Sequence, residues 1–220
     1  MNVDVDTAPF IIDRVRPLTG SVYVVRFSRN EMQFIPGQYL LIGLPGSARM
    51  REYSIYSGMQ DPYLEILIQE VDDGKMSKAL KKIKPGERID VHGPEGKFLS
   101  EASGVAPGKL LFIASGTGIA PFHSFVRSYP LAEYRLIHGI RTRDEAYDLN
   151  AYRKEHMVLC TSRDRRGDFS GRVTDYLVAN PTDPDQQVYL CGSSQMIRDA
   201  IKILNASGIP REKIITEVYY

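Results

Sequence analysis

The chain has few cysteines, no long apolar run and almost no net charge, and each of these absences excludes a class of protein. Its two cysteines, Cys160 and Cys191, are too few for a disulfide framework or for the four thiolates of a common iron–sulfur cluster. No apolar run approaches the roughly 18 residues that a membrane helix needs, and the opening MNVDVDTAPF lacks the basic and apolar segments of a signal peptide. We therefore expect a soluble, cytoplasmic protein without membrane attachment.

The charge balance excludes a polyelectrolyte. The 28 Lys and Arg residues offset 27 Asp and Glu residues to leave a formal charge of +1, so nothing drives sequence-independent binding to nucleic acid. With 43% hydrophobic residues, the 220-residue chain can form one large domain or two of about half its length. We expect a monomer, and any charged partner has to meet a local patch.

The first half of the chain has the pattern of antiparallel strands. Up to about residue 100, short period-two runs such as SVYVVRFS, QYLLIGL and YLEILIQEV are separated by Gly, Pro and Asn. The one convincing helix is SKALKKIK, with Ser77 as its N-cap, and it ends before Pro85-Gly86. We predict an antiparallel β-barrel domain over residues 1–101.

The second half has a different pattern. Five apolar runs, KLLFIAS, YRLIHGI, HMVLCTS, QVYLCGS and KIITEVYY, alternate with stretches long enough for helices near 121–129, 145–155, 172–179 and 194–206. Strands that are apolar on both faces and alternate with helices indicate a covered parallel sheet. We predict an α/β Rossmann-like domain with a five-stranded parallel sheet over residues 102–220, joined to the first half through the small, polar segment 101–108.

The run KLLFIAS leads directly into Gly116-Thr117-Gly118-Ile119-Ala120-Pro121. Two glycines permit a sharp turn and a close approach by a ligand, and Pro121 suits the first turn of a helix whose free N–H groups attract phosphate. The loop therefore has the form of a pyrophosphate site. Pro121 stands where the usual dinucleotide fingerprint has a third glycine, so a tight turn without a ligand is the alternative interpretation.

Cations follow the next strands of the predicted sheet. Arg141 lies where an NAD site usually has an acidic residue, and Ser162-Arg163 and Arg172 follow further along the chain. Guanidinium groups match a 2′-phosphate, which favours NADPH over NADH. Each arginine alone is more often a solvated surface residue, and Asp144 and Asp164 are close enough to offset part of the charge. Cys191-Gly192 leaves room for a flat ring, although a buried cysteine is more often plain core.

The first half contains a second combination suited to a phosphate. In Arg51-Glu52-Tyr53-Ser54, strand alternation sends Arg51 and Tyr53 to one face, which presents a cation beside an aromatic ring. The Gly74 loop opens the SKALKKIK helix, whose N-terminal amides form another anion site. In isolation, the same residues describe an ordinary strand with an exposed arginine.

Together, the motifs PGQY, REYSI, DGKMS, GTGIAP, SR, GRV, CGSSQMIRD and EVYY resemble those of the ferredoxin–NADP reductase family, most closely its bacterial ferredoxin/flavodoxin–NADP reductase branch. The resemblance covers nearly the whole chain, and the ordered set is far more specific than any single motif. It implies an FAD-binding barrel followed by an NADP-binding domain, with the flavin in the cleft between them.

The resemblance also implies residue roles. Residues implied for FAD are Arg51, Tyr53, Ser54, Ile55, Ile68, Gly74, Lys75, Met76, Ser77, Thr117, Tyr219 and Tyr220. Residues implied for NADPH are Gly116, Gly118, Arg141, Ser162, Arg163, Arg172, Cys191, Gly192, Gln195 and Met196. Ser54, Cys191 and Glu217 are the implied catalytic residues, which place nicotinamide against the flavin. Of the two terminal aromatic residues, we expect Tyr219 to cover the flavin ring and Tyr220 to lie beyond it. No metal site is expected.

The implied activity is hydride transfer from NADPH to FAD, followed by single-electron transfer to a ferredoxin or flavodoxin. A basic run that follows the predicted flavin loop could attract such an acidic carrier, or it could be a solvated helix face: Lys75, Lys78, Lys81, Lys82, Lys84 and Arg88. Two alternatives stay open, namely the reductase component of an oxygenase and a catalytically silent electron-transfer or flavin-binding subunit of a larger complex.

Overall fold

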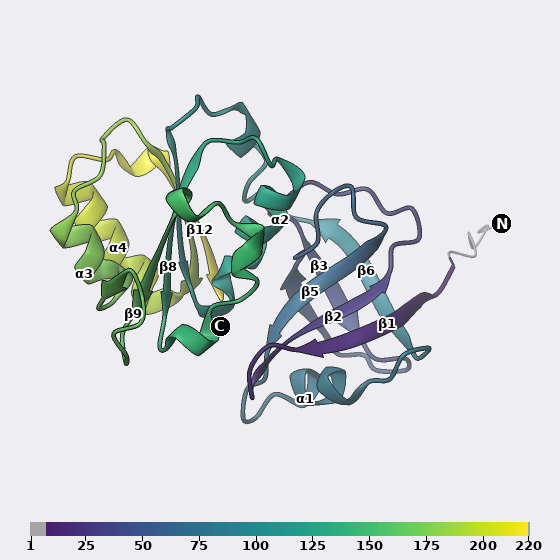
Figure 1. Ribbon diagram of the computed structural model, residues 1–220. Coiled ribbons are helices and arrows are strands. Elements are labelled where there is room, and N and C mark those ends of the chain that lie inside the picture. Colours follow the sequence, from purple (N-terminus) through teal and green to yellow (C-terminus); the bar gives the residue numbers. More distant parts are fainter. Residues whose placement is uncertain (1–7, 220) are drawn as a thin grey trace.

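The computed structural model describes residues 8–219, and its first domain is built on an antiparallel six-stranded sheet (Figure 1). The strand order is β4-β3-β6-β1-β2-β5, and a single bridge between Ile55 and Ile66 links the two edges. The sheet is therefore barrel-like without a continuous closing ladder, and the predicted antiparallel class is confirmed. Its strands are β1 (Phe10–Pro17), β2 (Val22–Ser28), β3 (Tyr39–Gly43), β4 (Met50–Ser54), β5 (Tyr63–Gln69) and β6 (Arg88–Glu95).

Helix α1 (Lys75–Lys82) closes one end of the barrel (Figure 1). Leu80 is fully buried among the core residues of this domain, as the amphipathic pattern requires. The prediction of Ser77 as N-cap is wrong, since Gly74 occupies that position. Ser77 is the third helical residue, and its hydroxyl donates to the Gly74 carbonyl at 3.1 Å and accepts from the Val71 amide. The hydroxyl therefore holds the preceding turn rather than capping the helix.

The second domain contains a parallel sheet with six strands, so the prediction of five is corrected. The order is β10-β9-β8-β7-β11-β12. The additional strand lies at the edge of the sheet and consists of two residues, Phe169 and Ser170, which pair with Cys160 and Thr161. A strand of two residues has no periodic pattern from which it could be predicted. The strands are β7 (Leu110–Ser115), β8 (Tyr134–Ile140), β9 (Met157–Thr161), β10 (Phe169–Ser170), β11 (Gln187–Ser193) and β12 (Ile214–Tyr219).

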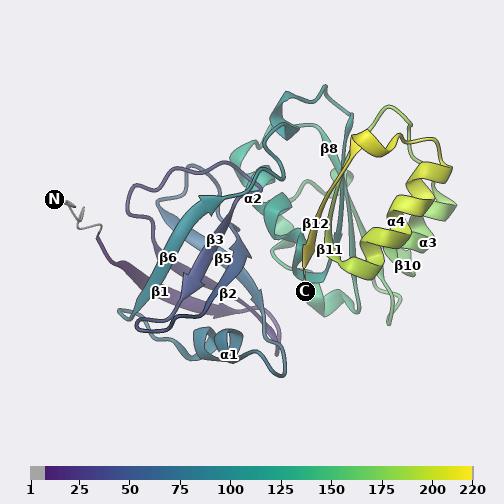
Figure 2. The same ribbon diagram turned by 180° about the vertical axis from the view of Figure 1, so that it is seen from behind.

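Three helices cover this sheet. α3 (Val173–Ala179) and α4 (Ser194–Ala206) lie on one face, and α2 (Ala120–Ser128) lies on the other, between the sheet and the barrel (Figures 1 and 2). The helix expected over 145–155 is absent, and the chain there forms only isolated 3₁₀ turns. Asp148 has a φ of 43°, a left-handed conformation that interrupts helical hydrogen bonding. Among the helices of residues 8–219, none has the length and hydropathy needed to cross a bilayer.

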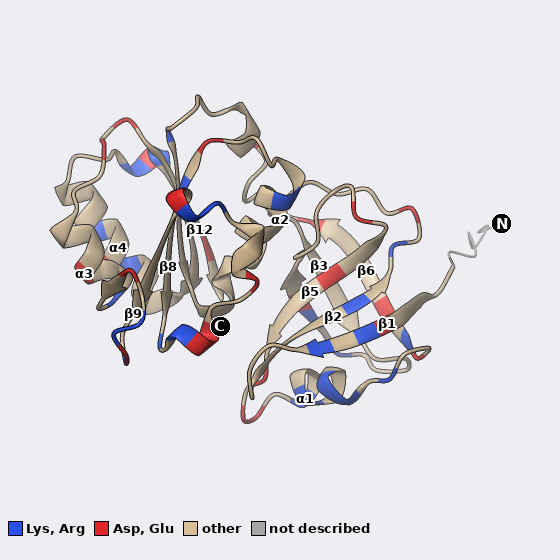
Figure 3. Ribbon diagram, in the orientation of Figure 1, with Lys and Arg blue, Asp and Glu red and all other residues tan. Residues whose placement is uncertain are grey.

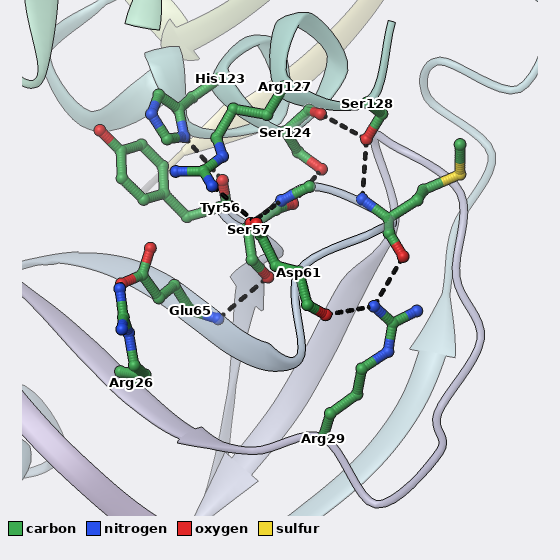
Figure 4. A network of polar contacts seen from close by, with 12 residues as sticks. Arg26, Arg29, Tyr56, Ser57, Asp61, Glu65, His123, Ser124, Arg127 and Ser128 are labelled. Carbon is green, nitrogen blue, oxygen red and sulfur yellow. Dashed lines mark hydrogen bonds and ion pairs between the residues drawn. The ribbon is translucent and has the colours of Figure 1, made fainter.

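The domains meet where α2 packs on residues 56–61 of the barrel (Figure 4). The Tyr56 and His123 rings stack with centroids 3.6 Å apart, and His123 Nδ1 donates to the Tyr56 carbonyl at 2.7 Å. The Ser124 hydroxyl donates to the Ser57 carbonyl at 2.7 Å, and Arg127 binds Asp61 at 2.6 Å. Burial lowers the pKa of His123 to about 4, so this imidazole is neutral near pH 7 and packs without a charge to solvate.

A second contact lies beside the first. Arg16 binds Asp148 through two hydrogen bonds of 2.9 and 2.7 Å, and the Tyr56 hydroxyl donates to the same carboxylate at 3.0 Å. One apolar cluster also spans both domains, with Val24 and Leu67 from the barrel and Phe112 and Phe122 from the α/β domain among its members. Apolar burial and satisfied polar groups therefore act together to fix how the domains meet.

The glycine loop is tightly packed at one position, which gives a test of the fold. A Cβ on Gly118 would lie 2.4 Å from the Cys191 carbonyl oxygen, whereas a Cβ on Gly104 would meet nothing within 4 Å. We expect Gly118→Ala to lower the free energy of unfolding by about 1–3 kcal/mol because β11 must shift. Gly104→Ala should change it by less than about 0.5 kcal/mol. Urea titration of both variants measures this, and equal effects would contradict the packing.

Candidate functional site

Three of the predicted site residues meet at the boundary between the two domains. Ser54 ends β4 of the barrel, and its Oγ donates to Glu217 Oε1 at 2.8 Å. Cys191 and Glu217 are register partners on β11 and β12. The sequence places Ser54 and Glu217 163 positions apart, so only docking of the domains brings them together. The structure thus assembles a hydroxyl, a thiol and a carboxyl in one place.

Burial controls the ionisation of this cluster. It raises the pKa of Glu217 from 4.5 to about 7, against the Ser54 hydrogen bond, which lowers it. Burial likewise raises the pKa of the Cys191 thiol well above its usual value, and the Glu217 carboxylate adds to that shift. Cys191 is therefore a neutral thiol at neutral pH, which excludes a thiolate nucleophile. Glu217 can take up or release a proton near pH 7.

Tyr219 borders the same cluster from the end of β12. Its ring packs against the apolar cluster shared by the two domains, and its buried hydroxyl has no hydrogen-bond partner within residues 8–219. Burial raises the pKa of this hydroxyl strongly, and Cys191 and Glu217 raise it further. An unpartnered buried hydroxyl is costly, and it marks a position where a bound polar group could be received. Tyr220 lies outside the described residues.

The glycine loop predicted to hold a pyrophosphate adjoins this cluster. Gly116 has a φ of +54° and faces open space, whereas Gly118 packs against the Cys191 backbone. The buried His138 on β8 donates from Nε2 to the Gly116 carbonyl at 2.9 Å, and burial lowers the pKa of His138 to about 4. Residues 116–119, which include Thr117, lie against β5 of the barrel. The loop therefore has open space at Gly116, and the His138 hydrogen bond and the Cys191 backbone hold its position.

Gly192 is required for a close approach of β11 to β7. It has a φ of +141°, and a Cβ there would lie 2.2 Å from the Ser115 hydroxyl oxygen. That oxygen accepts a hydrogen bond from the Ser193 amide at 3.1 Å. The strand ends that carry Gly116 and Cys191 are thereby held side by side at the crevice.

The barrel presents a set of donors suited to a pyrophosphate. Arg51 is exposed on β4, and among the residues that the structure describes its guanidinium hydrogen-bonds only the neighbouring Met50 carbonyl. α1 begins after Gly74 with no side-chain cap and no acidic residue in its first turn, so its first N–H groups remain available for an anion. Lys75 is exposed there and Met76 is half-buried.

The remaining residues implied for the barrel side differ in what they can offer. Tyr53 is half-buried, and burial raises its pKa to about 12, so its ring is neutral and partly accessible. Ile55 and Ile68 lie in the barrel core, 0% and 1% exposed. Their side chains are not brought to the crevice, and only their backbone can meet a ligand.

The cations predicted for a 2′-phosphate gather at one edge of the parallel sheet. The Arg163 amide donates to the Arg141 carbonyl at 2.7 Å, and the Gly171 amide donates to the Thr161 carbonyl at 2.9 Å, which draws Arg172 to the same edge. Arg141, Ser162, Arg163 and Arg172 are all exposed. Within residues 8–219, the three guanidinium groups form no ion pair.

Gln195 and Met196 lie at the start of α4. The Gln195 amide donates to Asp199 at 2.7 Å and its oxygen accepts from Arg198 at 2.9 Å. Met196 packs against the core of the α/β domain, and its amide donates to the Ser193 hydroxyl at 3.3 Å. Both residues are engaged with their own helix in this structure.

Sequence reasoning missed several residues that position the site. His138 supports the glycine loop, and the Tyr56–His123 stack holds the domains together. Arg166 binds Asp144 and Asp164, the acidic residues expected to offset the arginine set. A histidine within the apolar run YRLIHGI was the one available signal, because a buried imidazole needs a partner. The Tyr56–His123 and Arg166–Asp144 contacts link segments distant in the sequence.

Glu217 gives the stability of the protein a pH dependence near neutrality. Because burial raises its pKa from 4.5 to about 7, the folded protein binds this proton more tightly than the unfolded chain. The stabilisation is complete below pH 4.5 and is lost as the pH rises to about 7. We expect the urea midpoint of the wild type to fall from pH 5 to pH 8 by more than that of Glu217→Gln. Equal falls would contradict the assigned protonation.

Family models and known proteins agree with this arrangement. A model described as the oxidoreductase FAD-binding domain matches residues 17–99, and one described as the oxidoreductase NAD-binding domain matches residues 112–202. The flavodoxin/ferredoxin–NADP reductase of Rhodobacter capsulatus is 30% identical, over 94% of this chain and 92% of its own length. The reductase component of propane 2-monooxygenase from Rhodococcus jostii is also 30% identical, over 94% of this chain and 62% of its own.

Solved structures share the fold. The ferredoxin–NADP⁺ reductase of Neisseria gonorrhoeae, with bound FAD and NADP, superposes with a TM-score of 0.81 at 23% identity, covering 97% of this chain and 100% of its own. The Amycolatopsis cytochrome P450 reductase gives a TM-score of 0.84 at 24% identity, over 96% of this chain and 68% of its own. With the two domains, the assembled crevice and these relatives taken together, the chain belongs to the ferredoxin–NADP reductase family of FAD- and NAD(P)-binding oxidoreductases.

Proposed function

We propose that this protein is an FAD-dependent reductase that oxidises NADPH and passes electrons singly to a ferredoxin or flavodoxin. The observation that carries the proposal is the Ser54–Glu217 hydrogen bond across the domain boundary, with Cys191 beside it. This contact joins a hydroxyl of the barrel to a carboxyl of the α/β domain whose pKa lies near 7, and it supports a shared site at the domain boundary.

The residues of the barrel fit FAD. The free guanidinium of Arg51 and the uncapped start of α1 are donors for a pyrophosphate, and Lys75, Met76 and Ser77 would lie along it. A Cβ on Gly74 would lie 2.4 Å from the Val71 side chain, so the turn that opens this helix depends on glycine. When bound, FAD supplies the chemistry that links a two-electron donor to one-electron acceptors.

The crevice residues orient the reactants and exclude water. The Ser54 hydroxyl is held by Glu217 at 2.8 Å and is positioned to hydrogen-bond a ring that enters the crevice. Cys191, a neutral and buried thiol, provides a small polarisable surface against which a flat ring can pack. Glu217 takes up or releases a proton near neutral pH, and its Oε1 accepts the Ser54 hydrogen bond. Tyr219 covers the crevice, and its unpartnered hydroxyl is available to a bound group when the ring moves.

The choice of NADPH over NADH rests on the exposed arginines at one edge of the parallel sheet, which we call the arginine edge: Arg141, Arg163 and Arg172. Arg141, Arg163 and Arg172 are exposed, and their guanidinium groups form no ion pair with any described residue; such groups match the geometry and charge of a 2′-phosphate. The Gly116 loop faces open space and would take the pyrophosphate. NADH lacks the phosphate that these cations would bind.

A basic surface on α1 supports an acidic electron carrier as the acceptor. The ribbon of α1 and the turn after it carries several Lys and Arg positions, coloured blue in Figure 3. Lys78 donates to the Asp72 carbonyl and Lys81 pairs with Glu70 at 2.7 Å, so these two are partly engaged. Lys82 and Lys84 are exposed, and their ammonium groups make no hydrogen bond or ion pair within residues 8–219. They supply the charge that would steer a carrier.

The second candidate function is the reductase component of an oxygenase system. It is favoured by the propane 2-monooxygenase reductase component and by the toluate 1,2-dioxygenase electron transfer component of Pseudomonas putida, which is 30% identical over 90% of this chain. The chain spans 62% and 63% of the length of these two relatives. In that case the electrons would pass to an oxygenase component instead of a free carrier.

Anaerobic reduction by NADPH tests the proposed function. We expect NADPH to bleach the flavin absorbance of the FAD-loaded protein in a stopped-flow instrument, and Ser54→Ala to slow this step by about 10²-fold because the ring loses its alignment. Ser103→Ala, an exposed serine elsewhere, serves as the control and should match the wild type. A flavin that stays oxidised in excess NADPH would overturn the function, and full-speed reduction in Ser54→Ala would remove the role of Ser54.

Charge reversal tests the carrier surface. Lys82→Glu/Lys84→Glu should lower the rate of ferredoxin or flavodoxin reduction several-fold at low ionic strength and flatten its salt dependence, because steering falls with charge. Lys202→Glu, an exposed lysine on α4, is the matched control. NADPH oxidation by a small uncharged dye should be equal in all variants, and a carrier rate equal to that of the control would exclude this surface.

A further inference from the structure

We propose that Arg166 determines affinity for the 2′-phosphate by holding Asp144 and Asp164 away from the three arginines that would bind it. Arg166 is thereby assigned as a positioning residue for cofactor specificity. The inference rests on the proposed preference for NADPH, and it explains why the three arginines are not paired with Asp144 or Asp164. Arg166 itself belongs to none of the sequence motifs.

Arg166 bridges the two carboxylates. Its Nη2 lies 2.9 Å from Asp144 Oδ2, and its Nε donates to Asp164 Oδ2 at 3.1 Å. The Arg166 backbone amide donates to the other Asp164 oxygen at 3.1 Å, and the Arg143 amide donates to Asp164 Oδ2 at 2.9 Å. Arg143 Nη1 donates back to the Arg166 carbonyl at 3.2 Å. These contacts tie the loops after β8 and β9 into one unit.

The bridged carboxylates stand beside the arginine edge. Asp164 follows Arg163 in the chain, and Asp144 lies three residues after Arg141, within the 3₁₀ turn Arg143–Glu145. The Arg163 amide donates to the Arg141 carbonyl at 2.7 Å, so the two loops run together. Either carboxylate would have an arginine of the predicted phosphate set within its own loop as an alternative partner.

Asp164 stays ionised at any physiological pH. The backbone amide of Arg143 and the bonds from Arg166 lower its pKa to about 2. Its negative charge is therefore constant across this range, and the Arg166 side chain is its ion-pair partner. Asp144 is largely exposed, with 76% of its side chain accessible, so it is free to turn once Arg166 is removed.

The four arginines therefore differ in what they bind. Arg166 is engaged by both carboxylates, whereas the guanidinium groups of Arg141, Arg163 and Arg172 form no ion pair within residues 8–219. Removing the Arg166 side chain would take the ion-pair partner from both carboxylates, although the backbone amides that bind Asp164 would remain. The negative charge left beside the proposed site would repel a phosphate. Because the site is exposed, solvent and salt screen the effect and keep it moderate.

Binding of two nucleotides that differ by one phosphate tests the inference. We would measure the Kd of adenosine 2′,5′-diphosphate and of 5′-AMP by calorimetry on the FAD-loaded protein at low salt. Arg166→Ala should weaken the diphosphate by roughly 3- to 10-fold, in keeping with exposed ion pairs, and leave 5′-AMP unchanged. The triple variant Arg166→Ala/Asp144→Asn/Asp164→Asn should recover the wild-type Kd within about twofold, because the amides remove the repulsion.

Arg165→Ala is the matched control, since it removes one positive charge from the same loop without breaking an ion pair. We expect it to change the Kd of the diphosphate by less than twofold. An equal loss in Arg165→Ala would show that only the total charge matters and would overturn the inference. Failure of the triple variant to recover would make Arg166 a direct ligand and would also overturn it.

The outcomes separate this inference from the function on which it rests. A wild type that binds the diphosphate no more tightly than 5′-AMP would exclude the NADPH preference itself, and Arg166 with it. A wild type that discriminates, together with an Arg166→Ala variant that discriminates equally well, would exclude only the role of Arg166.

Discussion

The docking of α2 on residues 56–61 is the constraint on which the site depends. Tyr56 lies two residues beyond Ser54, so the stack of Tyr56 on His123 fixes the end of β4 relative to the α/β sheet. The hydrogen bond from His123 to the Tyr56 carbonyl adds direction to this apolar contact. Because the segment is short and buried, a shift of α2 would move Ser54 away from Glu217. The contact between domains is therefore part of the site as well as of the fold.

At the domain boundary, the cluster of Cys191 and Glu217 lies between two groups of cations. At the centre, burial keeps the Cys191 thiol protonated and brings Glu217 near neutrality. One end has Arg51 and the free amides of α1, and the other has the arginines that follow β8 and β9. This distribution suits dinucleotides, whose phosphates carry the charge and whose rings are flat and weakly polar.

The sequence predicts strong periodic elements well and weak or long-range ones poorly. The apolar runs placed the core strands, and the segment expected to be helical over 194–206 matches α4. Two residues at Phe169 carry no pattern, so the sixth strand was missed. The stretch 145–155 had the length of a helix, but Asp148 in a left-handed conformation prevents one. Ser77 has the chemistry of a cap, and the turn at Gly74 uses its hydroxyl instead.

The sequence by itself determined which groups were available: the glycine loop, the arginines, and Ser54, Cys191 and Glu217 as separate motifs. Residue types and their spacing along the chain are fixed by the covalent sequence, so local conformational preferences can be inferred from them directly. Only the tertiary structure decided that Ser54 reaches Glu217, that Arg166 holds the two aspartates and that burial moves the Glu217 pKa to about 7. Each of these depends on segments that the chain brings together when it folds, and both dielectric environment and contact distance are properties of the packed molecule.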